Sequence, residues 1–329
     1  MATTGKALVI TASGGTEVFS LVEAHPIRAP DVGEVLVKLV ATSVNPVDVY
    51  VRSGMYASKT FPKVIGGDLA GHVVALGNGS SSKFEVGDAV FALSDAYIPY
   101  SAFEGTYAEY ALVKEEWVAK APVPDNLPLV HAAGVPLVYL TALQALEKAR
   151  PQPGQRILVL GGSGAVGQFG VQLAKVLHGL HVTAVSSPAY ADLVASLGAD
   201  TVWDYTAGGA LDAAFADAPF DIVFDVIGGA LLDASAKVLK AGGVITHIQN
   251  RGSGDAPARY KAAHEAGTGP RFEATLVQPS GPGLEQAAEL FNAGKIRIKV
   301  AQTLPLADAG KAHDIVIDGH AGGKIVLTL

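Results

Sequence analysis

The hydrophobic residues of the first 127 positions fall in short runs, and turn-forming residues separate one run from the next. The separators include Gly-Gly, Pro-Asp-Val-Gly, Gly-Asn-Gly and Val-Gly-Asp, which are typical of turns between strands. This pattern predicts an all-β segment, which we expect to curl into a barrel. Its strands are expected at residues 6–10, 34–40, 70–76, 88–93 and 106–113.

From residue 131 onward the apolar residues recur at spacings of three and four, which predicts helices. A helix at 131–148 is followed by a strand at 156–160, a helix at 168–178 and a strand at 181–185. A strand, helix and strand in about 30 residues form a βαβ unit, which requires a parallel sheet covered by helices. The alternation continues with helices at 191–197, 210–216 and 231–239 and strands at 201–203, 221–226 and 244–248.

The last part of the chain changes pattern again. Residues 251–270 are rich in glycine and charge, and they predict a loop. A helical stripe at 284–291 ends at Gly294, and apolar and basic residues then alternate at 296–300, which predicts a half-exposed strand. We expect this tail to leave the parallel sheet and rejoin the β-rich segment, with a last strand at 324–329.

Composition narrows the class of protein. Of the 329 residues only 17% are charged and none is cysteine, which excludes a largely disordered chain, disulfides, thiolate nucleophiles and cysteine-ligated zinc. The net charge of -7 comes without runs of like charge, so we expect a small-molecule partner and no nucleic acid. The sequence shows no signal peptide and no apolar run of the roughly 18 residues that span a membrane, and we expect a cytoplasmic protein.

A glycine-rich turn carries the strongest chemical signal. It lies directly after the strand at 156–160 and directly before a helix, and it fits G-x-G-x-x-G with Gly162, Ser163, Gly164, Ala165, Val166 and Gly167. The first glycine permits a tight turn, the second allows a pyrophosphate to approach the backbone, and the third lets the helix pack on the strand. The helix N-terminus then offers free N–H groups to the anion. This context indicates dinucleotide binding.

The end of the second strand of this unit bears on the choice of cofactor. An NAD-selective site usually carries an acidic residue there, whereas this chain has Ser186 and Ser187. Two hydroxyls can donate to a 2′-phosphate that a carboxylate would repel, so NADPH is favoured over NADH. Tyr205 could add a phenolic donor. The alternative interpretation of the serines is a solvated strand end before Pro188.

The ordered motifs resemble the medium-chain dehydrogenase/reductase superfamily, in particular its zinc-independent quinone oxidoreductase and alkenal or enone reductase branch. The resemblance covers essentially the whole chain. It rests on the glycine turn with the helix that follows, SLGAD at 196–200, GKIV at 323–326, and the segments NPVDVYVRSGMY (45–56), GGDLAGHVVALG (66–77), FEVGDAVFA (84–92), GTYAEYALV (105–113) and GVPLVYLTALQAL (134–146).

The resemblance implies an α/β protein with two domains. Residues 1–127 and 267–329 would form a GroES-like β-rich catalytic domain. Residues 128–266 would form a Rossmann domain with a doubly wound parallel sheet, and the cofactor would lie in the cleft. Zinc-dependent relatives hold catalytic metal through a cysteine and a His-Glu pair, where this chain has Asn45 and the Gly67-Asp68 pair. The resemblance also implies a homodimer or homotetramer.

The same resemblance implies a set of site residues. Asn45 would approach the nicotinamide ribose or the substrate, and Asp48 would organise its loop. Tyr50 and Tyr56 would line the substrate cleft, where either one could donate a proton to a nascent oxyanion or serve only as an aromatic wall. Two further residues resemble cofactor contacts in the family, namely Thr141 and Lys324, although Lys324 could also be an ordinary surface lysine.

The chemistry expected without a metal is hydride transfer to a conjugated acceptor. A quinone or an α,β-unsaturated carbonyl gives a delocalised phenolate or enolate that hydrogen-bond donors can stabilise, whereas simple alcohol oxidation loses the help of a Lewis acid. We therefore expect an NADPH-dependent reductase of quinones or enones. The alternative is an NADPH-binding redox sensor or structural protein with little turnover.

Overall fold

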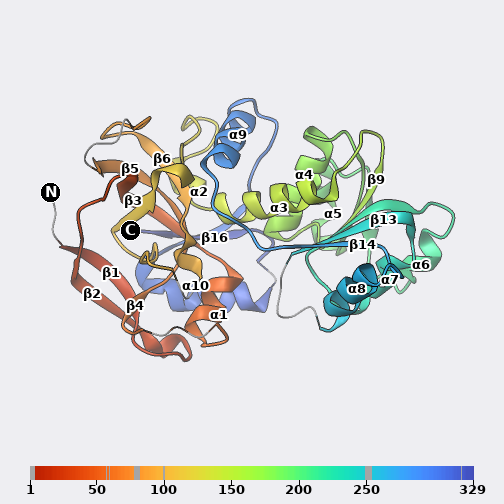
Figure 1. Cartoon of the computed structure of the whole chain (residues 1–329), viewed down its shortest axis with the longest axis horizontal. Helices are drawn as coiled ribbons and strands as arrows, with labels where there is room; N and C mark the ends of the chain where they lie inside the picture. The colour runs from red at the N-terminus through yellow and green to blue at the C-terminus, as the bar shows by residue number, and fades with distance from the viewer. Residues whose placement is uncertain are drawn as a thin grey trace. The chain divides into compact units, whose positions relative to one another are not determined.

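The computed structural model describes residues 4–56, 58, 60–77, 82–98, 101–248, 254–319 and 321–329. The chain divides into two compact units, which Figure 1 shows as ribbons. The first unit consists of Met1–Leu140 and Gln278–Leu329, and the second consists of Thr141–Val277. The domain bounds expected from the sequence stay a prediction, but the first unit does return through the end of the chain.

The first unit is built mainly from β-structure. One sheet follows the strand order β15-β16-β3-β5-β6-β8, with β7 also paired to β3, and a smaller sheet follows the order β2-β1-β4. The strands of the unit are β1 (Thr4–Ile10), β2 (Phe19–Pro26), β3 (Glu34–Val44), β4 (Lys63–Val64), β5 (Asp68–Leu76), β6 (Ala89–Leu93), β7 (Tyr110–Lys114), β8 (Val118–Lys120), β15 (Val300–Pro305) and β16 (Lys324–Thr328).

Over the described residues, four α-helices lie wholly in the first unit: α1 (Pro46–Arg52), α2 (Leu129–Ala132), α9 (Gly281–Asn292) and α10 (Ala309–Asp318). α1 and α10 pack against each other, and α9 packs on β8. The last strand, β16, is antiparallel to β3, with Leu327 opposite Thr42. This pairing confirms that the tail rejoins the β-rich segment, although the expected barrel is present as two sheets over the described strands.

The second unit contains a parallel six-stranded sheet in the order β11-β10-β9-β12-β13-β14. The order reverses direction between β9 and β12, as in doubly wound sheets that bind nucleotides. Helices cover both faces, with α4 and α5 on one side and α6, α7 and α8 on the other (Figure 1). The strands are β9 (Arg156–Leu160), β10 (His181–Ser186), β11 (Thr201–Asp204), β12 (Phe220–Asp225), β13 (Leu239–Ile248) and β14 (Arg271–Thr275).

The helices around this sheet are α3 (Pro136–Ala149), which begins in the first unit, α4 (Ala165–Val176), α5 (Ala191–Ser196), α6 (Leu211–Ala214), α7 (Gly229–Ala236) and α8 (Ala256–Glu265). The central strands β9, β10 and β12 are buried on both faces over most of their length, and Leu158, Phe224 and Ile245 are fully enclosed. Burial on both faces explains why these strands appear in the sequence as continuous apolar runs.

Several expectations from the sequence were wrong in detail. The segment 45–56 is a helix over most of its length, and the segment 251–270 contains α8, with residues 251–253 outside the described part. α8 was not predicted because its sequence, APARYKAAHE, has no stripe of large apolar residues at helical spacing. Residues 296–299 alternate in burial as expected, but the strand β15 begins only at Val300. Alternation reports which side chains are buried and not whether the backbone has a partner strand.

β14 belongs to the sheet of the second unit. Its residues 271–275 were assigned to the returning catalytic domain, but they pair in parallel with β13 at the edge of the second unit's sheet.

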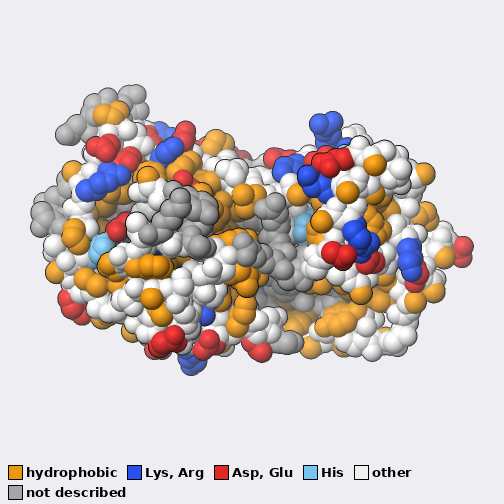
Figure 2. Space-filling model, turned by 60° about the horizontal axis from the view of Figure 1, so that its bottom comes forward, with side chains coloured by type: hydrophobic (Ala, Val, Ile, Leu, Met, Phe, Trp, Pro, Cys, Tyr) orange, Lys and Arg blue, Asp and Glu red, His pale blue; other side chains and the backbone are white. Residues whose placement is uncertain are grey.

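Among the described residues, no helix has the length and apolar content to cross a membrane. On the face drawn in Figure 2, acidic and basic side chains are interspersed, which agrees with the absence of long runs of like charge in the sequence.

Candidate functional site

The glycine turn of the second unit joins β9 to α4, as the sequence predicted. Gly162 N–H donates to Val185 O over 3.0 Å, which fixes the turn against the end of β10. The left-handed residue of the turn is Gly161, with φ of +77°, and not the first glycine of the motif. Gly161 carries the sharp bend because glycine adopts positive φ without a steric penalty.

The three motif glycines differ in the space around them. A Cβ at Gly167 would lie 2.1 Å from Gly161 O, and one at Gly162 would lie 2.9 Å from the Ala184 Cβ. These two glycines are therefore required by close packing. A Cβ at Gly164 would meet only Gly161 O, at 3.4 Å, so this face of the turn is open. A pyrophosphate needs such an open backbone face.

α4 begins at Ala165, directly after the exposed Gly164. The first N–H groups of a helix have no partner within it and carry the positive end of its dipole, so this edge suits an anion. Ser163 contributes its carbonyl to the scaffold, because Gln168 Nε2 donates to it over 2.7 Å. Ala165 and Val166 are half-buried in the first turn. The residues of the turn fit the phosphates of a dinucleotide.

The end of β10 has one buried and one accessible hydroxyl. Ser186 is 2% exposed and donates to Ser187 O over 3.2 Å, whereas Ser187 is half-buried. Tyr205 is 56% exposed and follows β11. The structure also places Asp204 in register with Ser186, which the sequence interpretation did not weigh. Asp204 Oδ1 accepts two hydrogen bonds from Thr206, at 2.8 Å and 2.7 Å.

The sequence interpretation missed an Asp-His pair at the same edge of the sheet. His247 Nδ1 lies 2.7 Å from Asp225 Oδ2, and both side chains are buried. Asp225 Oδ1 also accepts the backbone N–H groups of Ile227 and Gly228 at 2.9 Å and 2.8 Å. Because Asp225 pairs with Leu160 in register, the pair lies level with the start of the glycine turn. A buried polar pair ending two neighbouring strands is the signal that could have identified it.

In the first unit, Asn45 precedes α1 and Pro46 occupies the first helical position, where a missing N–H costs nothing. Asn45 is 1% exposed. Tyr50 lies within the helix and Tyr56 just beyond it, and their rings meet edge to face with centroids 5.8 Å apart. Burial and the nearby Tyr56 raise the pKa of Tyr50. The structure thus brings the two expected tyrosines together.

Asp68, at the start of β5, is the centre of a buried hydrogen-bond network. Its Oδ2 accepts from Ser43 Oγ at 2.6 Å and from Asn45 Nδ2 at 2.8 Å. Its Oδ1 accepts the backbone N–H of Leu137 at 2.7 Å. Lys324 Nζ lies 3.4 Å from Oδ2 and completes the set. The carboxylate is fully enclosed, and these four donors replace the water that it loses on folding.

Lys324 is not an ordinary surface lysine, because its side chain is 3% exposed and directed into this network. Its expected contact with the cofactor stays a prediction. Its ammonium donates to Asn45 Oδ1 at 2.6 Å and to Val44 O at 3.0 Å, besides its contact with Asp68. Burial lowers the pKa of Lys324, and the Asp68 carboxylate opposes that shift. An ammonium has three N–H donors, so the contacts within this network account for all of them.

Asp48 belongs to a second buried cluster, beneath α1. Its Oδ2 accepts the backbone N–H of Asn45 at 2.8 Å and lies 3.5 Å from Tyr107 Oη. Tyr107 Oη in turn lies 2.9 Å from His313 Nε2. Burial raises the pKa of Asp48 to about 7, and burial together with the charge of Arg52 lowers the pKa of His313 to about 3. Asp48 therefore anchors the start of α1.

This cluster contains buried polar atoms that no described side chain or backbone group satisfies. They are Asp48 Oδ1, His313 Nδ1, Arg52 Nε and Arg52 Nη1. Tyr107, Arg52 and His313 had no role in the sequence interpretation. Tyr107 and Arg52 lie within two segments that carry the family resemblance, at 105–113 and 45–56, but no pattern in the sequence links them to His313. Their only sequence signal is polarity inside otherwise apolar runs.

The residues at the expected zinc-ligand positions do not form a zinc site. The chain has no cysteine, Asn45 stands at the cysteine position, and Gly67 has no side chain to donate. The remaining carboxylate, Asp68, already holds an ammonium. Over the described residues, no three histidine, aspartate or glutamate side chains gather as a metal-binding group.

Thr141, the other residue expected to contact the cofactor, lies in α3 and is 6% exposed. Its cofactor contact stays a prediction.

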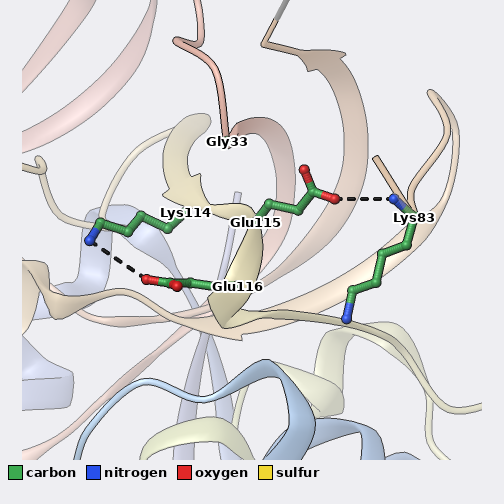
Figure 3. Close-up of a pocket in the computed structure, with 5 residues that line it drawn as sticks. All are labelled: Gly33, Lys83, Lys114, Glu115 and Glu116. Carbon is green, nitrogen blue, oxygen red and sulfur yellow. Dashed lines mark hydrogen bonds and ion pairs between the residues drawn. The ribbon is translucent and has the colours of Figure 1, made fainter. Parts of the chain in front are cut away.

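A surface hollow of about 450 Å³ is lined by Gly33, Lys83, Lys114, Glu115 and Glu116 (Figure 3). Its charges are paired, with Lys114 Nζ 3.6 Å from Glu116 Oε1 and Lys83 bound to Glu285, so it offers no reactive group.

Comparison with known proteins agrees with this architecture. The family model described as "Alcohol dehydrogenase GroES-like domain" matches residues 31–125, and the one described as "Zinc-binding dehydrogenase" matches residues 197–327. The solved structure of the quinone oxidoreductase from Coxiella burnetii superposes with a TM-score of 0.86 at 27% identity, covering 98% of this chain and 99% of that chain. The expected pair of a GroES-like fold and a parallel Rossmann sheet is confirmed.

Two curated relatives are similar over most of their length. The human "NAD(P)H oxidoreductase RTN4IP1, mitochondrial" is 33% identical over 332 residues, covering 90% of this chain and 82% of the human protein. The "NADPH-dependent alkenal/one oxidoreductase, chloroplastic" of Arabidopsis thaliana is 33% identical, covering 98% of this chain and 79% of the plant protein. The chain therefore belongs to the medium-chain dehydrogenase/reductase superfamily, where its relatives include quinone oxidoreductases and alkenal/one reductases.

Proposed function

We propose that this protein is an NADPH-dependent oxidoreductase that transfers hydride to quinones or to the C=C bond of α,β-unsaturated carbonyls without zinc. Relatives named as quinone oxidoreductase and as alkenal/one oxidoreductase support the reaction class. The observation that carries the proposal is the open backbone face at Gly164, at the start of α4. The substrate would be a small molecule, and a homodimer or homotetramer and a cytoplasmic location stay predictions.

The glycine turn would hold the cofactor's pyrophosphate. Gly162 and Gly167 keep β9 and α4 close, and Gly164 leaves room for the anion. Ser163, Ala165 and Val166 would contribute backbone N–H groups, which bind phosphate oxygens without the flexibility of side chains. The reduced nicotinamide supplies the hydride when it is bound.

Selectivity for NADPH over NADH rests on the end of β10. Ser187 and Tyr205 are the accessible hydroxyl donors there, and Ser186 shapes the strand end from inside. Asp204 opposes this preference, because a carboxylate repels a 2′-phosphate, but both of its hydrogen bonds to Thr206 draw Oδ1 into a local turn. We expect NADPH to bind more tightly than NADH by a modest factor.

The side chains proposed to act on the substrate belong to the first unit. When hydride adds to a quinone or an enone, negative charge develops on the carbonyl oxygen, and a fixed donor stabilises it. Asn45 is such a donor, and Tyr50 or Tyr56 could supply a second hydrogen bond or a proton. Asp48, with its pKa raised to about 7 by burial, supports the backbone of Asn45 instead of meeting the substrate.

The test measures the oxidation of NADPH through the loss of its near-ultraviolet absorbance, with a naphthoquinone and with an alkenal as separate acceptors. Turnover with either acceptor, in protein freed of metal by a chelator, supports the proposal. Tight NADPH binding with no oxidation by any acceptor would instead identify a sensor or structural protein. The Tyr50→Phe, Tyr56→Phe double variant then decides the proton donor, because full turnover in that variant removes the tyrosines from the role.

A further inference from the structure

The network around Asp68 fixes the orientation of the Asn45 side chain. Asn45 Oδ1 faces the Lys324 ammonium at 2.6 Å, and an ammonium can only donate. Asn45 Nδ2 faces the Asp68 carboxylate at 2.8 Å, and an ionised carboxylate can only accept. A flipped amide would place donor against donor and acceptor against acceptor. The two charges therefore determine which way the amide points.

The elements that supply these residues are distant in sequence and are joined by strand pairing. Asn45 follows β3, Asp68 begins β5 and Lys324 begins β16, and β3 pairs with both of the other strands. Gly134 packs closely against Lys324, because a Cβ there would lie 3.4 Å from the Lys324 Cβ. All three side chains are at most 3% exposed, so the charges of Asp68 and Lys324 are weakly screened and act strongly on the amide between them.

We infer that Lys324 is a positioning residue for the reaction: with Asp68 it holds the Asn45 amide so that one Nδ2 hydrogen is spent on Asp68 and the other is the donor for a reacting oxygen. This inference rests on the proposed function. The ammonium takes the place of a metal ion as the fixed cation beside residues 45 and 68. Lys324 acts through Asn45, because its three N–H groups already donate hydrogen bonds to Asn45, Val44 and Asp68.

Lys324→Gln in the full chain tests the inference, with Lys311→Gln, an exposed lysine of the same unit, as the matched control. We expect Lys324→Gln to lower kcat about 100-fold for quinone and alkenal, as the loss of one oxyanion donor does, while the Kd for NADPH changes less than twofold. Lys324→Arg, which keeps a cationic donor, should retain more of kcat. A raised Kd with normal kcat would overturn the inference and restore Lys324 as a cofactor contact.

A double variant separates positioning from a direct role. If Lys324 acts only through Asn45, then Asn45→Ala and Asn45→Ala, Lys324→Gln have the same kcat. A further loss in the double variant contradicts the inference. If Lys324→Gln does not fold, Asp68→Asn takes its place, because an amide no longer dictates the orientation of Asn45. Unchanged kcat in folded Asp68→Asn would overturn the inference.

A readout independent of activity distinguishes this inference from the proposed function. The side-chain amide signal of Asn45 in a nitrogen-15 NMR spectrum is identified by its loss in Asn45→Ala. It should shift in Lys324→Gln and stay in place in Lys311→Gln. An unmoved signal contradicts the inference even if the enzyme is active. If the signal shifts in Lys324→Gln but the wild-type protein oxidises no NADPH, the positioning role is retained and the proposed reaction is ruled out.

Discussion

The glycine turn of the second unit and the Asp68 network of the first unit show two ways of building a site. The turn is made of backbone, and its parts lie within seven consecutive residues, from Gly161 to Gly167. The network is made of side chains from residues 43, 45, 68 and 324, which come together only through strand pairing. Local sequence determines the first kind of site, whereas tertiary packing determines the second.

The two sites also differ in what holds them together. The turn depends on the absence of side-chain atoms, since a Cβ at Gly167 would overlap Gly161. The network depends on compensation, since Asp68 and Lys324 are both buried and each offsets the desolvation of the other. Substitutions should therefore disrupt the turn by steric overlap, and they should disrupt the network by leaving a buried charge unpaired.

The largest effect should follow removal of the buried cation. Lys324→Met leaves Asp68 enclosed without its counter-ion, and we expect a loss of about 4 kcal/mol in the free energy of unfolding. Lys175→Met breaks the exposed pair with Asp200, which is 2.6 Å long, and should cost less than about 1 kcal/mol. Urea unfolding of both variants checks the contrast. Equal losses would show that burial does not govern the strength of these pairs.

Gly167→Ala should come next. Its Cβ would lie 2.1 Å from a backbone oxygen that cannot move without opening the turn, and we expect a loss of about 3 kcal/mol. Gly164→Ala is the matched control, because its Cβ meets only one atom at 3.4 Å, and it should change stability by less than about 1 kcal/mol. Thermal unfolding measures both. A stable Gly167→Ala protein would contradict the close packing.

The cluster beneath α1 gives a prediction on pH. Burial raises the pKa of Asp48 from 3.8 to about 7, so in this range the folded chain holds a proton that the unfolded chain lacks, and stability falls as pH rises. Burial lowers the pKa of His313 from 6.5 to about 3, so there the unfolded chain holds the extra proton, and stability rises with pH. The two slopes cancel over their shared range.

Single variants should expose the two opposite slopes. Relative to wild type, Asp48→Asn should add an upward slope of about 1.4 kcal/mol per pH unit between pH of about 4 and 6, and His313→Gln a downward slope of similar size. Urea unfolding at several pH values measures them. Asp314→Asn, an exposed acid on α10, serves as the control. Parallel curves for all three variants would contradict the assigned protonation states.

The smallest effect is expected at the charged surface hollow. Glu116→Gln removes one partner of an exposed ion pair and should change the unfolding free energy by less than about 0.5 kcal/mol. Turnover with every acceptor should equal that of wild type. A clear loss of turnover in this variant would show that the hollow takes part in function after all.

The sequence predicted the part of the molecule that depends on local pattern. The βαβ order and the glycine turn follow from periodicity and from glycine spacing, and both are present in the second unit. The direction of Lys324 could not be predicted, because it depends on β16 lying beside β3. The Asp225–His247 pair was missed for the same reason, since two parallel strands bring it together.

The most direct measurement is a calorimetric titration of NADPH into the wild-type chain and into Gly164→Ala. We predict one site per chain in wild type, binding at least tenfold weaker in the variant, and the same unfolding temperature in both, because the added methyl group fills only the face left for phosphate. Equal affinity in the two proteins, or no heat in wild type, would contradict the assignment of this turn as the cofactor site.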